Sequence, residues 1–168
     1  MDNFTIFNLQ NLSAFILFYL AFRWWVQPRL NKMTIYDALL PVVFYHGIRF
    51  LGMTFMVDGQ FYDGFPEDDA LMIGVGDYAV SVLAIITAIA LKAKNKFAIP
   101  LTWFTMIVGL VDLVNAFRLV GAQEFWQYDI EGIWYLMLLT GPPAIITTVY
   151  AFYRLIKPSK VDKVLAHK

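Results

Sequence analysis

Five long apolar stretches, separated by short polar segments, constrain this chain more than any other feature of its sequence. A helix needs about 20 predominantly apolar residues to cross the hydrocarbon core of a bilayer. The stretches cover residues 10–27, 34–57, 70–92, 98–120 and 130–156. Because 60% of the residues are hydrophobic and only 15% are charged, the composition argues against a water-soluble domain. The sequence predicts an all-α integral membrane bundle of five transmembrane helices.

The segments between these stretches contain residues that end or begin helices. Gln27-Pro28-Arg29 marks the first gap, and residues 58–69 fill the second with three glycine or proline residues. Residues 92–96 and 121–129 form the third and fourth gaps. We therefore expect a five-helix transmembrane domain over residues 1–157 and a short basic cytoplasmic tail over residues 158–168.

Lysine and arginine are distributed unequally between the two ends of the predicted helices. Eleven of the thirteen basic residues fall on one side: Arg23, Arg29, Lys32, Lys92, Lys94, Lys96, Arg154, Lys157, Lys160, Lys163 and Lys168. The positive-inside rule assigns that side to the cytoplasm. The gaps on the opposite side are acidic. We expect the amino terminus outside, the carboxyl terminus inside, and insertion into a bacterial cytoplasmic (inner) membrane.

Five arginine, histidine, aspartate or asparagine side chains lie deep within the predicted spans, where the bilayer offers them no water. They are His46 and Arg49 in the second span, Asp77 in the third, and Asp112 and Asn115 in the fourth. A charge in hydrocarbon costs a few kcal/mol or more. Each of these side chains is therefore expected to pair with another group or to serve a function. Counted from the outer helix ends at 1.5 Å per residue, Arg49, Asp77 and Asp112 lie at a common depth of roughly 10–13 Å. The spacing predicts an ion pair between Arg49 and one of the aspartates, with charged atoms about 4 Å or less apart.

The small residues around both aspartates indicate that these carboxylates face other helices. Small side chains permit close helix approach in lipid. One stripe at helical spacing is Gly74, Asp77, Ser81, Ala84 and Ala88, and the other is Thr102, Thr105, Gly109, Asp112 and Ala116.

Two interpretations of this cluster remain open. As a structural clamp, Arg49 would only fix the register of the helices. As a functional site, two carboxylates against one guanidinium leave a negative charge that a proton, a cation or protonated His46 can balance. A ligand- or ion-binding site would then comprise Arg49, Asp77, Asp112, His46 and Asn115.

The fifth span contains Thr140-Gly141-Pro142-Pro143, a second polar or irregular feature at membrane depth. Two consecutive prolines remove two backbone donors from a helix. Broken helices at this depth often line ligand sites in transporters, although proline kinks also serve packing alone. We expect a helix break here whose residues line the site.

The sequence also argues against several kinds of partner and cofactor. The formal net charge is zero, which gives no reason to expect nucleic acid. No cysteine is present, and His167 is the only histidine besides His46. A metal site is therefore not expected, and the sequence indicates no particular cofactor.

Gly76-Asp77 on one helix, Trp103 through Gly109 to Asp112-Leu113 on the next, and Arg49 upstream form a recognisable pattern. In this pattern the chain resembles small multi-pass bacterial membrane proteins of unknown function, over roughly residues 46–115. The resemblance implies that the arginine and aspartate positions recur in such proteins, and it implies no activity.

Three functions follow as hypotheses. The first is binding or translocation of a proton, a cation or a small polar ligand, for which a homodimer could be needed to build a path across the bilayer. The second is a membrane-embedded enzyme acting on a lipid-like substrate, with His46 and a carboxylate as acid and base. The third is a structural or accessory subunit of a larger membrane complex.

Overall fold

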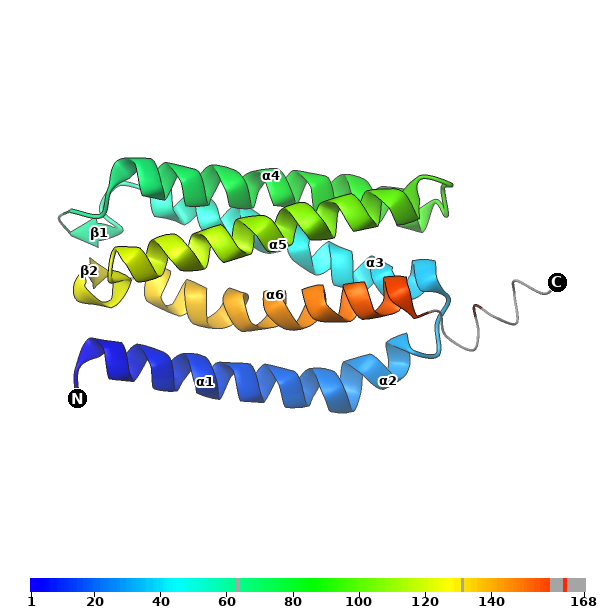
Figure 1. The fold of residues 1–168 in the computed structure, drawn as a ribbon, viewed down its shortest axis with the longest axis horizontal. Helices are drawn as coiled ribbons and strands as arrows, with labels where there is room; N and C mark the ends of the chain where they lie inside the picture. The colour runs from blue at the N-terminus through cyan, green and yellow to red at the C-terminus, as the bar shows by residue number, and fades with distance from the viewer. Residues whose placement is uncertain (63, 131, 158–161, 163–168) are drawn as a thin grey trace.

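The computed structural model is a bundle of long helices that run side by side (Figure 1). It describes residues 1–62, 64–130, 132–157 and 162. Five helical segments in these residues are long and apolar enough to cross a membrane, and they are Asn3–Leu30, Ile35–Met56, Glu67–Lys92, Ala98–Ala122 and Gly132–Ile156. The all-helical prediction is confirmed, and so is the number of helices that are long and apolar enough to cross a membrane. The tail predicted over 158–168 lies outside the described residues, apart from Asp162.

The first span is longer than the sequence predicts at both of its ends. Helix α1 (Asn3–Ala21) begins directly after Asp2, which caps its N-terminus. The Asp2 side chain accepts a hydrogen bond of 2.7 Å from the backbone N–H of Thr5. The helix continues through a π-helical turn, Phe22–Val26, into α2 (Gln27–Leu30). The predicted gap at Gln27-Pro28-Arg29 is therefore wrong. Proline is tolerated in the first turn of a helix, and Pro28 occupies that position in α2.

The second span changes its helical geometry halfway along. It is α-helical in α3 (Ile35–His46) and becomes a 3₁₀ helix from Gly47 to Met56. In a 3₁₀ helix, residues three apart lie directly above one another. The buried side of this span accordingly repeats every third residue: His46, Arg49, Gly52 and Phe55. The geometry places Arg49 between a histidine and a glycine on the face that meets the neighbouring helices.

This 3₁₀ segment packs against three of the remaining helices. Helices α4 (Glu67–Lys92) and α5 (Ala98–Ala122) lie along one another, and α6 (Gly132–Ile156) runs between them and α1 (Figure 1). The small-residue stripes face inward as predicted, since Gly74, Ser81, Ala84 and Ala88 are buried on α4 and Thr102, Thr105 and Gly109 on α5. Large apolar side chains on the outer surface, such as Leu17, Phe44 and Val111, are exposed. This arrangement is the one expected of a bundle whose surroundings are apolar.

The two ends of the bundle differ in charge. The end at which the chain begins, called the acidic end below, carries Asp2, Asp58, Glu67, Asp68, Asp69 and Glu124. The opposite end, the basic end, carries Arg29, Lys32, Lys92, Lys94, Lys96 and Lys157. At the acidic end, strands β1 (Phe61–Tyr62) and β2 (Asp129–Ile130) pair antiparallel with Phe61 opposite Ile130, which joins the two connecting loops.

Aromatic side chains form the core beneath these loops. Phe125 is fully buried, and its ring centroid lies 5.9 Å from that of Phe7, 6.0 Å from that of Phe55 and 6.5 Å from that of Phe65. The four residues come from α1, from the 3₁₀ segment and from both loops. Aromatic pairs at such distances contribute beyond their buried area. The Phe125 cluster therefore holds α1, the 3₁₀ segment and the two loops together at the acidic end of the bundle.

We expect Phe125→Ala to lower the free energy of unfolding by about 3–5 kcal/mol, since it removes a ring from the centre of a packed core. The measurement is the thermal unfolding midpoint of the purified protein in detergent. Phe44→Ala is the matched control, because Phe44 is 68% exposed on the outer surface. Equal midpoints for the two variants would contradict the assignment of this core.

Candidate functional site

Arg49 is the centre of a buried network that joins three helical elements. Its side chain lies on the 3₁₀ segment, and the residue is 7% exposed. Nε donates to Asp77 Oδ1 of α4 at 2.6 Å, Nη2 donates to Asp112 Oδ2 of α5 at 2.5 Å, and Nη1 donates to the carbonyl oxygen of Gly109 at 2.9 Å. The predicted ion pair is confirmed, with both aspartates engaged rather than one.

Each charged side chain of this network lies against a glycine of a neighbouring element. A Cβ atom added at Gly52 would overlap the Asp77 carboxylate, and one added at Gly76 would overlap the Asp112 carboxylate. A Cβ at Gly109 would lie 3.5 Å from Arg49 Nη1. Glycine here provides the space for close approach between backbone and side chain. The three glycines belong to the three elements that the ion pairs connect.

His46 takes part in a different interaction. Its Nε2 lies 3.2 Å from Thr147 Oγ1 of α6, while Thr147 donates to the carbonyl oxygen of Pro143 at 2.7 Å. The ring is 1% exposed. Within the described part of the chain, no hydrogen bond joins His46 to either aspartate, and Nδ1 has no partner. The structure thus brings His46 to α6 rather than into the ion-pair network.

Asn115 also lies apart from the network. Its Oδ1 accepts hydrogen bonds from Arg118 Nε at 3.3 Å and Arg118 Nη2 at 3.0 Å, one helical turn nearer the acidic end. The sequence placed Asn115 on the face of Asp112 because the two are three apart. The side chain instead satisfies an arginine on the outer side of α5.

The predicted break at Thr140-Gly141-Pro142-Pro143 is not present, since α6 is helical from Gly132 to Ile156 with both prolines inside it. A proline frees the carbonyl four residues earlier, here the carbonyls of Leu138 and Leu139. Two side-chain hydrogen bonds nearby go to other carbonyls of α6. Thr140 Oγ1 donates to the Leu136 carbonyl at 2.7 Å. Tyr45 OH donates to the Thr140 carbonyl at 3.3 Å, which ties α6 to α3.

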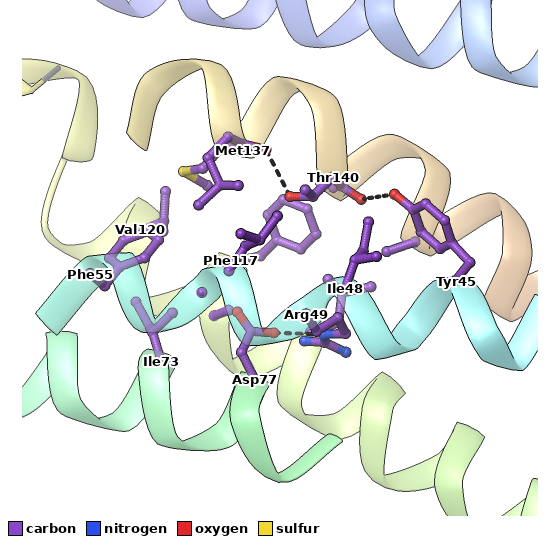
Figure 2. Close-up of a pocket in the computed structure, with 17 residues that line it drawn as sticks. Tyr45, Ile48, Arg49, Phe55, Ile73, Asp77, Phe117, Val120, Met137 and Thr140 are labelled. Carbon is purple, nitrogen blue, oxygen red and sulfur yellow. Dashed lines mark hydrogen bonds and ion pairs between the residues drawn. The ribbon is translucent and has the colours of Figure 1, made fainter. Parts of the chain in front are cut away.

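A cavity of about 70 Å³ lies between the 3₁₀ segment and α6. Figure 2 shows Arg49 and Asp77 on the side away from α6, and Thr140 and Met137 on the side that α6 forms. Its other lining residues are mostly apolar and include Ile48, Phe55, Ile73, Leu113, Phe117 and Val120. Thr140 and Gly141 line it as predicted, whereas Pro143 lines a second apolar pocket beside α1. The arrangement places one carboxylate of the network at the wall of an otherwise apolar space.

Two features of the structure were not predicted. Tyr45 lines the cavity, and nothing in an apolar span indicates which of its aromatic residues faces inward. Arg154, assigned only to the basic end, is 1% exposed. It donates from Nη1 to Asp162 Oδ2 at 2.9 Å and from Nη2 to the Met33 carbonyl at 3.0 Å. Asp162 lies in the tail, so no pattern within the spans reveals this pair.

The comparison with known protein families matches most of the chain. A family model described as "Domain of unknown function (DUF8737)" matches residues 6–156. The chain belongs to this family. No curated protein and no solved structure matches the chain. Arg49, Asp77 and Asp112 all lie within the matched residues.

We expect Gly52→Ala to destabilise the protein, because the new methyl group would displace the Asp77 carboxylate from Arg49. The direction of this change in stability is informative, because alanine in place of a helical glycine otherwise stabilises a protein by roughly 0.5–1 kcal/mol. Gly47→Ala is the matched control, as its Cβ would meet only Ile85 at an ordinary 3.7 Å. The measurement is the unfolding midpoint in detergent, and a Gly52→Ala midpoint at or above the control would contradict the packing.

Proposed function

We propose that this chain is an integral protein of a bacterial cytoplasmic membrane, with its amino terminus outside and its carboxyl terminus in the cytoplasm. The support is the charge difference between the two ends of the bundle. Lysine and arginine gather at the end that holds the 31–34 and 93–97 connections and the end of α6. Asp and Glu gather at the other end. Cytoplasmic loops carry the excess of basic residues in membrane proteins.

We further propose that the network of Arg49, Asp77 and Asp112 binds a proton or a cation, reached from the exterior. The observation that carries this proposal is that two carboxylates share one guanidinium beside a cavity. A surplus negative charge in an apolar surrounding is costly unless it is neutralised. A proton or a cation supplies that neutralisation, and the cavity gives it a place next to Asp77.

The position of the network supports access from the acidic end. At 1.5 Å per residue, Asp77 and Asp112 lie roughly 15 Å from the ends of α4 and α5 at that end. The remaining length of both helices separates them from the basic end. The acidic residues around the connecting loops attract cations toward this side, an effect that salt weakens.

A structural role is the second candidate, and one observation favours it. Every nitrogen of the Arg49 guanidinium already donates to an acceptor, and each ion lies close against a glycine. Such a network fixes the register of three helices without any ligand. In that case the chain acts as an accessory or structural subunit of a membrane complex, and its ion pairs serve assembly alone.

For the topology, a reporter active only in the cytoplasm should be active when fused after Lys168. The same reporter fused after Gly59, in the connection at the acidic end, should be inactive there. A reporter active only in the exterior should give the reverse result at both positions. Exterior activity after Lys168 would overturn the proposed orientation.

For the binding site, the unfolding midpoint of the wild-type protein in detergent should rise on acidification or on addition of a monovalent cation. At 100 times its dissociation constant a ligand adds about 2.7 kcal/mol, which is roughly 5–10 °C for a chain of this size. Asp77→Asn should abolish the rise, because it leaves Arg49 and Asp112 as a neutral pair. Asp112→Asn should reduce it, because it removes the surplus charge but leaves the Asp77 carboxylate at the cavity wall.

Asp37→Asn is the control for this experiment, since Asp37 is an exposed carboxylate near the basic end that pairs with Lys94. It should retain the response of the wild type. If Asp77→Asn and Asp112→Asn fold and respond as the wild type does, the structural role becomes the better account.

A further inference from the structure

The hydroxyl groups that line the cavity beside Asp77 offer hydrogen-bond acceptors rather than donors. A hydroxyl group has one proton to donate, and both hydroxyls that line the cavity have used theirs. Tyr45 donates to the Thr140 carbonyl and Thr140 donates to the Leu136 carbonyl. The oxygen of each of these two hydroxyl groups can still accept a hydrogen bond from a ligand.

The charged groups at the wall add to this acceptor character. Asp77 Oδ1 accepts from Arg49, while Oδ2 accepts no hydrogen bond from the residues that the structure describes. Arg49 donates from all three of its guanidinium nitrogens within the protein, which uses three of its five N–H groups. The surplus negative charge and the free carboxylate oxygen are complemented by a hydrogen-bond donor with a positive charge. An anion would meet acceptors and a surplus of negative charge.

The size and the walls of the cavity restrict the donor further. A volume of about 70 Å³ is roughly half of the ~150 Å³ that holds benzene in an engineered protein cavity. It accommodates a ligand of about three non-hydrogen atoms by that comparison. A desolvated divalent metal ion needs about six oxygen ligands, which this mostly apolar lining does not provide. The rings of Phe55 and Phe117 suit a short alkyl group or the face contact of a cation.

We infer that the cavity between the 3₁₀ segment and α6 binds a small primary ammonium ion, from ammonium to ethylammonium, with its charged nitrogen at Asp77. This inference rests on the proposed function and names the class of cation. The N–H groups of the ion donate to the free carboxylate oxygen, its charge balances the network, and its alkyl part contacts the apolar wall.

The test measures the unfolding midpoint of the full chain in detergent with methylammonium chloride, at constant total ionic strength. The wild-type midpoint should rise by roughly 5–10 °C at saturation. Tetramethylammonium should give no rise, because it is larger and has no N–H group. Sodium and potassium should give less than methylammonium at equal concentration. Asp77→Asn should lose the methylammonium response, and Asp37→Asn should retain it.

Ala116→Leu provides a second variant that leaves every charged group in place. Ala116 lines the cavity, so the larger side chain fills the space that the alkyl group needs. We expect at least a tenfold rise in the apparent dissociation constant for methylammonium, whether or not Asp77→Asn folds.

The outcomes separate this inference from the proposed function. A response to sodium or to acidification that Asp77→Asn abolishes, without a response to methylammonium, overturns the ammonium class and leaves a cation or proton site in place. A methylammonium response that persists unchanged in both Asp77→Asn and Ala116→Leu overturns this location. No response to any cation or to acidification overturns both proposals.

Discussion

The cost of removing the Arg49 guanidinium from water is the constraint on which this bundle depends. A buried arginine must find acceptors for its nitrogens, and it finds three: two carboxylates and one backbone carbonyl. They belong to α4 and α5, so Arg49 holds the 3₁₀ segment in one register against both helices. The glycines at 52 and 76 follow from the same requirement, because a Cβ there would overlap a carboxylate of the network, and Gly109 accepts from Arg49 through its carbonyl oxygen. The network therefore determines residue types on all three elements.

This network specifies the packing more than it stabilises the fold. Buried ion pairs often barely repay their desolvation, although removing one partner is costly. Stability comes instead from close packing at both ends. The Phe125 cluster occupies the acidic end, while Leu39, Val43, Ala84 and Leu91 form the core toward the basic end. Arg49 lies between these two cores, where the helices could otherwise slide past one another along apolar surfaces.

The number of helices and the ion pair could be predicted from the sequence, since hydropathy sets span length and depth follows from helical rise. The change to 3₁₀ geometry at Gly47 could not. The sequence gives residue spacing, whereas only tertiary packing decides that His46, Arg49, Gly52 and Phe55 stack at three-residue intervals. The same limitation misplaced His46, which faces Thr147 on α6, and Asn115, which binds Arg118. Pro28 and Pro142-Pro143 were interpreted as interruptions because proline lacks a donor. Pro28 stands in the first turn of α2, and Pro142 and Pro143 stand inside α6, which continues as a helix through them.

The cavity has two walls of different character. The wall containing Asp77 is fixed by three charge-assisted or backbone contacts that span the 3₁₀ segment, α4 and α5. The wall formed by α6 carries no charged group toward the cavity, and beside Thr140 it contains two prolines that donate no backbone hydrogen bond. The backbone ladder of α6 therefore lacks two hydrogen bonds beside the cavity. Near Thr140 its link to the second span is the hydrogen bond from Tyr45. In the proposed site, a cation at Asp77 would therefore meet α6 through apolar contacts across the cavity.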